Sequence, residues 1–599
     1  MIYHCEDHTC NYWDEGEKLP ERCPQCGRKL LRANEADMTG DDWTALGNTL
    51  WDAEASDKKR MVDCFRKAAY LGSAWGVCNL GICMEQGNGV EADPVQAFWL
   101  YQQAVEMGSL NAVCCLGVCY QYGIGTAPDA KQAAELYCKA AEYGSPRGQM
   151  LLARAFHDGI GVEADAAEAV YWVRAAAYQR YGEGMHRLGV CYEYGDGVEQ
   201  NWERAVHWFR EAAESGVGVA MTDLGYCYEK GCGVEQSWEQ AFSWYRISAE
   251  CGNPVSMSNL GLCYQMGYGV EQNWQEAIKW YEQGAQCGDL QSMHNLACCY
   301  EGGEGVEQNE DRAFYWYRRS AEGGNGSAMC NLGRCYKRGY GVEQNWQEAV
   351  KWYEQGAQCG NLQSMHNLAC CYEHGEGVEQ NMTEAIRWYT AAAEGGNADD
   401  MYELGWQYDH GEGVEQDMKK AICWYERAAE QNHPAAMNSL GECYAMGRGV
   451  PRDLETAMEW YRRAAELGEA MADYNMGWHL EQAGKLSEAY THYRKAADGN
   501  DDSAWWALGR FYENGVVVAQ DGKEARRCYE TGEKLGSVKC KMRLARCKLL
   551  GIGGRRAKKA GLDLCRQALE LAKESSEKED YGYEAEMNLL RRTIAENES

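Results

Sequence analysis

Residues 253–288 read NPVSMSNLGLCYQMGYGVEQNWQEAIKWYEQGAQCG, a stretch that predicts two helices joined by a glycine-rich turn. The first helix is expected to begin at the cap Asn253 and the first-turn proline Pro254. Its apolar face is marked by residues at three- and four-residue spacing, namely Met257, Leu260, Gly261 and Tyr264.

The turn and the second helix follow directly. Gly267-Tyr268-Gly269-Val270 supplies glycines that can take the left-handed backbone in which helices end. Asn273 followed by Glu276 fits a capping box at the start of the second helix. The apolar stripe of that helix consists of Ala277, Trp280, Tyr281 and Ala285, and Gly288 ends it.

The same pattern recurs along most of the 599 residues. A Leu-Gly, Leu-Ala or Met-Gly dipeptide returns every 36 residues from Leu80 to Met476. Residues 268–301 and 340–373 differ at two positions, which indicates a duplication of two units. Neither helix of a pair can bury its stripe alone, so neighbouring pairs must stack. We therefore predict an all-α fold, a right-handed α/α superhelical solenoid of about 15 helix-pair repeats.

These residues resemble the Sel1-like repeat family, relatives of the tetratricopeptide repeats. The shared pattern is A-M-x-x-L-G-x-x-Y-x-x-G-x-G-V-x-x-[DNS]-x-x-x-A-x-x-W-Y-x-x-A-A-E-x-G, nearly complete in residues 220–252 and 328–360. Near the carboxyl end the chain departs from it, with a short turn at Gly484-Lys485-Leu486 and no G-V-x-x-D in residues 551–559. The resemblance implies a non-enzymatic adaptor or scaffold that binds proteins or peptides on the concave surface of the solenoid.

Four cysteines near the amino terminus have the spacing C-x4-C-x12-C-x2-C: Cys5, Cys10, Cys23 and Cys26. Two close thiolate pairs suit one tetrahedral Zn²⁺ ion, and the Cys-Pro-Gln-Cys-Gly turn resembles zinc ribbons and rubredoxin-like knuckles. Four protein ligands leave no open position, so the zinc would be structural. Iron is the alternative metal, and His4 or His8 could replace Cys5 or Cys10. The expected organisation is a zinc ribbon in 1–31, a linker in 32–41, the solenoid in 42–575 and a capping helix in 576–599.

The other 26 cysteines lie in the repeats, ten of them in one slot, three residues after the leucine. Equivalent sites on stacked repeats are expected about 10 Å apart, beyond the roughly 7 Å limit for a disulfide. We therefore expect buried free thiols and a reducing compartment. The ten slot cysteines are Cys83, Cys119, Cys191, Cys227, Cys263, Cys299, Cys335, Cys371, Cys443 and Cys547.

Two histidine–cysteine pairs share a helix face, His294 with Cys298 and His366 with Cys370. Two ligands do not make a metal site, so we interpret both pairs as surface polar residues. The sequence shows no Ser/His/Asp order, no H-E-x-x-H and no G-x-x-x-x-G-K-[ST]. We therefore expect no enzymatic activity.

By analogy with tetratricopeptide arrays, the first helix of each pair lines the concave surface. We call a position counted from the repeated leucine a slot. The side chains two residues before the leucine and two, five and six residues after it are then expected to project into this surface. Aromatic residues beside charges are typical peptide anchors, although packing against the next repeat is an equally strong interpretation for any one of them. The stretch from Tyr402 to Trp506 is the preferred groove, and Arg334, Lys337 and Arg338 form a basic island suited to an acidic peptide. The slot residues are His186, Tyr194, Tyr226, Glu229, Arg334, Lys337, Arg338, His366, Tyr402, Trp406, Asp409, Tyr474, Trp478 and Trp506.

Charge limits the partners. The chain has 59 Lys and Arg against 91 Asp and Glu, a net charge of −32, which argues against general nucleic-acid binding. The segment from Lys534 to Lys573 has twelve Lys or Arg against two acidic residues. This basic end is interpreted as a polar capping repeat, with salt-sensitive self-association as the alternative.

Targeting signals are also missing from the sequence. No stretch is apolar enough to span a bilayer, so no membrane partner is expected, and no secretory signal precedes the repeats. We expect a cytoplasmic, bacterial protein. Two alternatives stay open, an exported bacterial host-interaction factor and a nucleic-acid-associated protein that uses the zinc ribbon and the basic end.

Overall fold

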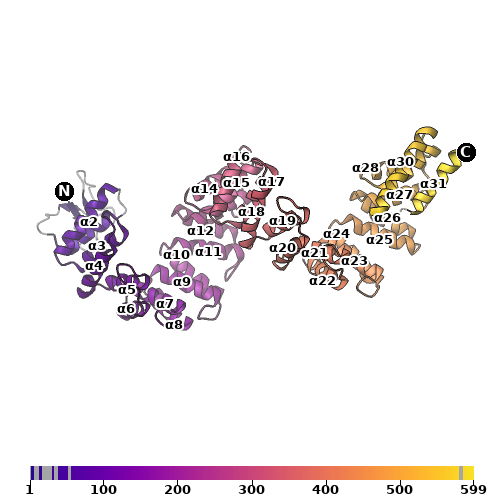
Figure 1. The fold of residues 1–599 in the computed structure, drawn as a ribbon. Helices are drawn as coiled ribbons and strands as arrows, with labels where there is room; N and C mark the ends of the chain where they lie inside the picture. The colour runs from indigo at the N-terminus through magenta and orange to yellow at the C-terminus, as the bar shows by residue number, and fades with distance from the viewer. Residues whose placement is uncertain are drawn as a thin grey trace. The chain divides into compact units, whose positions relative to one another are not determined.

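A computed structural model describes residues 2–5, 13–15, 30–32, 38–51, 55–578 and 584–598. In these residues the chain forms three short strands and helices α1–α31. The contacts divide it into two units, Met1–Gln308 and Asn309–Ser599. Each unit contains a solenoid of stacked helix pairs (Figure 1).

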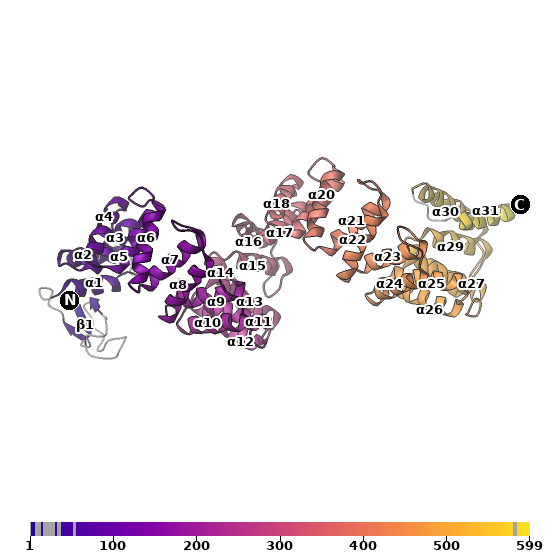
Figure 2. The same cartoon turned by 90° about the horizontal axis from the view of Figure 1, so that it is seen from below.

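The strands lie at the amino-terminal end of the first unit. Strands β1 (Ile2–Cys5), β2 (Trp13–Glu15) and β3 (Leu30–Arg32) form an antiparallel sheet with the order β2-β1-β3. Figure 2 shows β1 close to the first helices, and β2 contacts α1. This sheet lies in the segment for which a zinc ribbon is expected. Cys10, Cys23 and Cys26 fall outside the described residues, as does the side chain of Cys5.

The helices follow one another in regular order. The first unit contains α1 (Gly40–Thr49), α2 (Ala55–Tyr70), α3 (Ala74–Gln86), α4 (Pro94–Glu106), α5 (Leu110–Tyr122), α6 (Ala130–Glu142), α7 (Pro146–Asp158), α8 (Ala166–Tyr178), α9 (Gly182–Tyr194), α10 (Trp202–Glu214), α11 (Gly218–Lys230), α12 (Trp238–Glu250), α13 (Pro254–Met266), α14 (Trp274–Gln286) and α15 (Leu290–Gly302). The second unit contains α16 (Glu310–Glu322), α17 (Gly326–Arg338), α18 (Trp346–Gln358), α19 (Leu362–His374), α20 (Met382–Glu394), α21 (Ala398–His410), α22 (Met418–Glu430), α23 (Pro434–Met446), α24 (Leu454–Glu466), α25 (Ala470–Gln482), α26 (Leu486–Asp498), α27 (Asp502–Asn514), α28 (Gly522–Lys534), α29 (Val538–Leu550), α30 (Lys558–Lys578) and α31 (Glu584–Glu598).

The ends of the helices confirm the predicted caps Asn253, Asn273 and Gly267 of the pair α13/α14, although the Glu276 side chain pairs with Lys279 and, within the described residues, the reciprocal bond of a capping box is not seen. Asn253 caps α13 by accepting hydrogen bonds from two first-turn amides, and Asn273 does the same for α14. Gly267 ends α13 with a left-handed backbone at φ 75°. Gly269 is also left-handed, and a Cβ atom there would lie 2.2 Å from the carbonyl oxygen of Trp238 in the preceding pair. The second glycine of the turn therefore permits close stacking of consecutive pairs.

The small residue after each leucine lies against an aromatic ring of the second helix. A Cβ atom on Gly261 would lie 2.5 Å from the ring of Tyr281, which is fully buried. The Tyr281 hydroxyl donates to the side chain of Gln265 over 2.7 Å, whereas Trp280 is half-buried and packs against the edge of a core cluster. The same glycine–tyrosine contact recurs at Gly81–Tyr101, Gly117–Tyr137, Gly225–Tyr245, Gly333–Tyr353, Gly405–Tyr425, Gly441–Tyr461, Gly477–Tyr493 and Gly509–Tyr529.

The core consists of clusters of buried side chains, and the largest ones cross several helix pairs. One cluster of buried side chains extends from Ala153 in α7 to Cys227 in α11. A second extends from Ala369 in α19 to Met476 in α25. Each pair therefore buries its stripes against the next, as the stacking argument predicts.

We expect Gly261→Val to lower local stability by about 2 kcal/mol, because the added atoms would overlap the buried Tyr281 ring. Hydrogen exchange of peptides from α13 and α14 would report the loss, since long repeat arrays unfold in parts. Gly218→Val is the matched control, because the atom nearest to a Cβ there is 3.9 Å away. Equal exchange in the two variants would contradict the packing argument.

Candidate functional site

The slot five residues after the leucine has an internal role in several pairs. Tyr245 in α12 donates its hydroxyl proton to Glu229 of α11 over 2.8 Å. The Tyr425 hydroxyl lies 3.5 Å from Asp409, which also binds Arg448 over 2.9 Å. Glu229 and Asp409 therefore hold buried tyrosines in place, so these two slots contribute to packing as well as to the surface.

The other slots of the first helices differ in exposure. Tyr194 and Tyr226 are exposed. His186 is half-buried, and its Nε2 lies 2.7 Å from Oδ2 of Asp223 in the next pair. Slots of the same register therefore hold exposed aromatic side chains in some pairs and inter-repeat contacts in others.

Three of the predicted aromatic anchors pack against neighbouring side chains. Tyr402 is half-buried and stacks on His433 of the next pair, with ring centroids 4.9 Å apart. Tyr474 is also half-buried, 5.6 Å from the ring of Tyr493, and burial raises its pKa to about 12. Trp506 is half-buried as well. For these residues the packing interpretation holds at least in part.

Trp506 lies under two cations. The guanidinium of Arg510 is 4.6 Å from the ring centroid and the Lys539 ammonium is 5.3 Å from it. Burial lowers the pKa of Lys539. Among the described residues, the indole Nε1 of Trp506 is buried without a hydrogen-bond partner. Trp506 therefore joins α27 to α29 through cation–π contacts.

Trp406 and Trp478 are the remaining predicted anchors. Trp406 is half-buried and stacks on His410 of its own helix at 4.4 Å. Trp478 is 38 % exposed and borders a pocket of about 430 Å³ between α23 and α25, the Trp478 pocket. The pocket is lined by Glu442, Met446, Arg448, Tyr461, Tyr474, Asn475, Trp478 and His479.

The polar wall of the Trp478 pocket is fixed by internal contacts. Asn475 donates to Glu442 over 3.1 Å and to Asn438 over 3.0 Å. Arg448 lies 3.8 Å from Glu442 and is held by the buried Asp409. A tryptophan face beside preorganised donors and acceptors can receive an apolar side chain and the polar backbone next to it.

In the predicted basic island, Lys337 makes two contacts within the second unit. Lys337 pairs with Glu376 over 3.3 Å and lies 5.0 Å above the ring of Trp346. Arg334 is half-buried and Arg338 is exposed. The positive charge of the island is therefore partly neutralised within the second unit.

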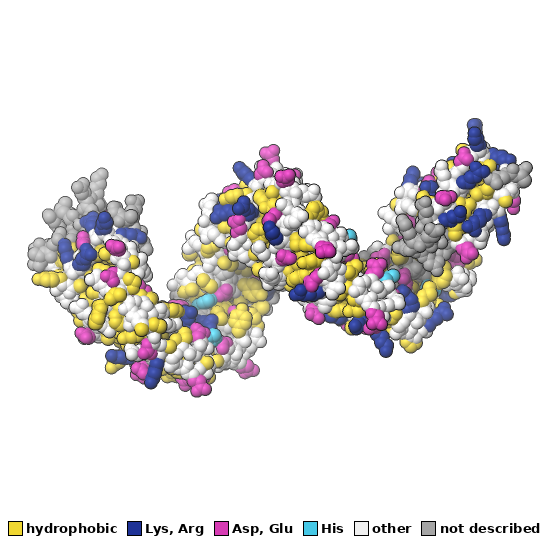
Figure 3. All heavy atoms as spheres, in the orientation of Figure 1, with side chains coloured by type: hydrophobic (Ala, Val, Ile, Leu, Met, Phe, Trp, Pro, Cys, Tyr) yellow, Lys and Arg dark blue, Asp and Glu magenta, His cyan; other side chains and the backbone are white. Residues whose placement is uncertain are grey.

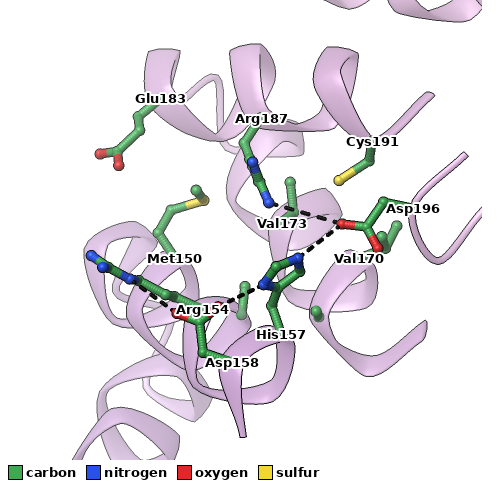
Figure 4. A pocket seen from close by; sticks show the side chains of 12 residues that line it. Met150, Arg154, His157, Asp158, Val170, Val173, Glu183, Arg187, Cys191 and Asp196 are labelled. Atoms are coloured by element: carbon green, nitrogen blue, oxygen red, sulfur yellow. Dashed lines mark hydrogen bonds and ion pairs between the residues drawn. The ribbon is translucent and has the colours of Figure 1, made fainter. Parts of the chain in front are cut away.

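A second pocket, of about 380 Å³, lies among α7, α8 and α9 in the first unit (Figure 4). We call it the Val173 pocket. In the pairs before and after it, the equivalent position holds a buried aromatic ring, Tyr137 and Phe209, each 36 residues away. In this pair the position holds Val173. The missing ring leaves a hollow beside Ala153 and Val170. This interruption of the aromatic series is visible in the sequence, but the search for exposed aromatic slots did not single it out.

Charged residues surround the mouth of the Val173 pocket (Figure 4). His157 occupies the slot that binds tyrosine hydroxyls elsewhere, and its two ring nitrogens lie 2.6 Å from Asp158 and 3.3 Å from Asp196. Arg154 lies 3.4 Å from Asp158, and Arg187 lies 3.9 Å from Asp196. The hydrogen bond with His157 is the main reason why the pKa of Asp158 is lowered. The pocket therefore combines an apolar floor with a rim that offers both donors and acceptors.

The ten cysteines of the repeated slot are all buried, and every cysteine in the described residues is a free thiol. Burial raises the pKa of several slot cysteines, for example that of Cys191 to about 11 and that of Cys263 to about 12. The expectation of buried free thiols is confirmed for the ten slot cysteines, whereas four other repeat cysteines are exposed: Cys251, Cys287, Cys359 and Cys423. The reducing compartment stays a prediction.

The basic end is partly tied into the fold. Arg543 lies 2.7 Å from Glu586 of α31 and 3.3 Å from Glu513 of α27. Arg546 also pairs with Glu513, and Arg556 donates to Asn597 over 2.6 Å. Figure 3 shows Lys and Arg side chains over the carboxy-terminal helices. These contacts support the capping interpretation, and salt-sensitive self-association stays a prediction.

No helix in the part of the chain that the structure describes is long and apolar enough to cross a membrane.

Stacked helix pairs with a period of 36 residues define a helical repeat protein of the tetratricopeptide-like class. The chain belongs to the Sel1 repeat family. The family model matches from residue 76 to residue 537, so the pairs α1/α2 and α29/α30 lie outside it. The matched residues are 76–109, 112–145, 146–181, 182–217, 218–253, 254–289, 290–325, 326–361, 362–397, 398–433, 434–469, 470–501 and 504–537.

Two solved structures are similar to this chain in sequence. The chain is 32 % identical to a protective antigen of uropathogenic Escherichia coli strains, over 75 % of this chain and 97 % of that one, with a TM-score of 0.50. It is 31 % identical to a Sel1 repeat protein from Oxalobacter formigenes, over 41 % of this chain and 99 % of that one, with a TM-score of 0.39. A search of curated proteins finds no match. This repeat fold is typical of non-catalytic interaction scaffolds, and no enzymatic family matches.

We expect Val173→Tyr to fill the Val173 pocket and to stabilise α7 and α8 by about 1 kcal/mol, because a buried ring replaces the hollow. Ala369 and Tyr389 hold the positions equivalent to Ala153 and Val173, and both lie in one buried cluster. A tyrosine in this position is therefore compatible with an alanine after the leucine. Slower hydrogen exchange of α7 and α8 would confirm the effect. Val206→Tyr, a buried valine outside the pocket, should instead speed exchange in α10, and faster exchange in the Val173 variant would contradict the assignment.

Proposed function

We propose that the chain is a non-enzymatic cytoplasmic scaffold that binds partner proteins or peptides through the first helices of its pairs. The observation that carries this proposal is the Trp478 pocket, where a partly exposed tryptophan stands beside fixed hydrogen-bonding groups. Binding energy in protein interfaces concentrates on such aromatic anchors with a polar surround.

The chemistry of the pocket favours an extended peptide. Trp478 offers an apolar face, Arg448 offers a donor and Glu442 offers an acceptor, so a side chain and its flanking peptide groups can both be satisfied. The wall is held by side chains from two neighbouring pairs, which reduces the ordering cost of binding. The Val173 pocket gives the first unit an anchor site of similar size. Arg334, Lys337 and Arg338 would favour acidic segments in the same partner.

A second candidate function is a bacterial host-interaction factor. The relative that favours it is the protective antigen of uropathogenic Escherichia coli, at 32 % identity over 75 % of this chain. The buried free thiols support the cytoplasmic scaffold instead, because oxidising compartments favour disulfides.

We also propose a structural zinc ion held by Cys5, Cys10, Cys23 and Cys26. The register pairs Cys5, at the end of β1, with Leu30, at the start of β3, and His4 with Trp13 at the start of β2. Cys26 precedes Leu30 by four residues, a reach of at most about 14 Å. Cys10 likewise precedes Trp13 by three residues. The strand topology thus supports four thiolates near one end of the sheet.

Replacing Trp478 by alanine should weaken peptide binding by roughly 30-fold, the loss typical of a central anchor. Peptides would first be selected from a random displayed library on the immobilised full chain, and affinities measured by fluorescence anisotropy. Trp99→Ala is the matched control, because Trp99 is 64 % exposed on α4, a second helix. Equal affinity of the two variants, with unchanged helicity, would argue against the Trp478 pocket.

The purified full chain should contain one zinc ion, measured by mass spectrometry of the metal, because four thiolates complete a tetrahedral shell. The double substitution Cys23→Ser and Cys26→Ser should remove it while the helical signal of the repeats persists. A chain without zinc or iron would refute the site, and iron in place of zinc would identify the rubredoxin-like alternative.

A further inference from the structure

Three side chains in the second unit form a connected array around His366. Its Nδ1 lies 2.7 Å from Oδ1 of Asp400, which stands on α21. Its Nε2 lies 3.6 Å from Sγ of Cys370, one turn along the same helix α19. The imidazole therefore joins a carboxylate on one side to a thiol on the other.

The carboxylate is fully buried. The Asp400 side chain is 0 % exposed, and among the described residues its Oδ2 has no hydrogen-bond partner. A buried carboxylate is costly unless a positive charge compensates it, so Asp400 favours the protonated form of His366.

The pKa of His366 follows this argument. The hydrogen bond with Asp400, the largest cause, and the contact with Cys370 together raise it to about 10. Glu403 of α21 also acts on His366 through its charge, and burial raises the pKa values of Glu403 and Asp400 themselves. These contacts favour the imidazolium form of the ring.

Cys370 is half-exposed and can meet a small reagent. An imidazolium beside a sulfur stabilises the thiolate, which is the nucleophilic form. The Tyr389 hydroxyl lies 3.3 Å from the same sulfur and also donates to Glu373 over 2.7 Å. The sulfur thus faces one cation, one hydroxyl and, beyond that hydroxyl, one carboxylate.

The duplication provides a copy of the pair in different surroundings. His294 Nε2 lies 3.8 Å from Sγ of Cys298, and its Nδ1 lies 3.3 Å from the amide oxygen of Asn295. The residue 34 positions after His294 is Ala328, whereas the residue 34 positions after His366 is Asp400. Residues 290–301 and 362–373 are identical in sequence. Their surroundings differ at Ala328 and Asp400 and also at Gly302 and His374, whose Nδ1 lies 3.0 Å from the carbonyl oxygen of Cys370.

A different thiol, Cys115, is hydrogen-bonded to Cys78, and that contact lowers its pKa. It is only 5 % exposed, so a reagent cannot reach it without local opening. The slot cysteines are buried, as described above. Within the described residues, Cys370 therefore combines access to solvent with a histidine held by a buried carboxylate.

We propose that Cys370 is a nucleophilic thiol that undergoes thiol–disulfide exchange with small disulfides, which makes α19 a site of reversible modification. The Cys370 sulfur attacks one sulfur of the reagent, forming a new S–S bond while the old one breaks. Cys370 is oxidised, the departing sulfur is reduced, and that thiolate takes the proton that left the Cys370 thiol. A second small thiol reverses the reaction.

The full chain would be treated briefly with bis(2-hydroxyethyl) disulfide at pH 7, quenched with acid and analysed by peptide mass spectrometry. This neutral probe is insensitive to the net charge of the chain. Cys370 should be modified about tenfold faster than Cys298, which is the internal control. Asp400→Asn should bring the rate at Cys370 down to that at Cys298 and leave Cys298 unchanged.

His366→Gln is the second variant and should have the same effect at Cys370. Loss of packing would act in the opposite direction, because it would raise the rate at Cys370 and expose the buried Cys371. If Cys371 becomes reactive in Asp400→Asn, that variant has lost packing, and the rate at Cys370 in His366→Gln is then the test of the proposal. Equal rates at Cys370 and Cys298 in the native chain, or an unchanged rate at Cys370 in the deciding variant, would overturn the proposal.

Discussion

The contact on which the structure depends is that between the backbone of a first helix and an aromatic ring of the second helix, which is a tyrosine in most pairs. No side chain larger than alanine follows the repeated leucine or methionine. The ring fills the space between the helices, and its buried hydroxyl then requires an acceptor. In several pairs that acceptor comes from the slot five residues after the leucine, as Glu229 and Gln265 show, whereas the slot beside the buried Tyr461 is Ala445. One steric constraint thus favours a polar residue in that slot.

Both pockets arise where this arrangement changes. Val173 interrupts the series of rings, and the slot residue His157, with no tyrosine hydroxyl to bind, contacts two carboxylates instead. In the Trp478 pocket, His479 occupies the slot that holds a buried cysteine in ten pairs, and burial lowers its pKa. In both cases a single residue that differs from the repeat pattern accompanies a pocket in an otherwise regular solenoid.

The histidine–cysteine pairs show how a neighbouring repeat can change local chemistry. His366 and His294 lie in nearly identical sequence, so intrinsic preferences cannot separate them. A single residue of the following pair, Asp400, places a negative charge at one imidazole and alters its protonation. The pattern alone favoured surface polar residues for both pairs, because it contains no information on which side chains meet across a stack.

The sequence by itself determined the helix pairs, their caps, the left-handed glycine at Gly267 and the buried thiols, because each depends on spacing within one repeat. The tertiary structure decided which slot residues remain available: Tyr402 packs on His433, whereas Trp478 stays partly exposed. It also brought together His366 and Asp400, 34 residues apart. Burial and ion pairing depend on side chains from the next pair, and a period measured along one helix cannot specify those contacts.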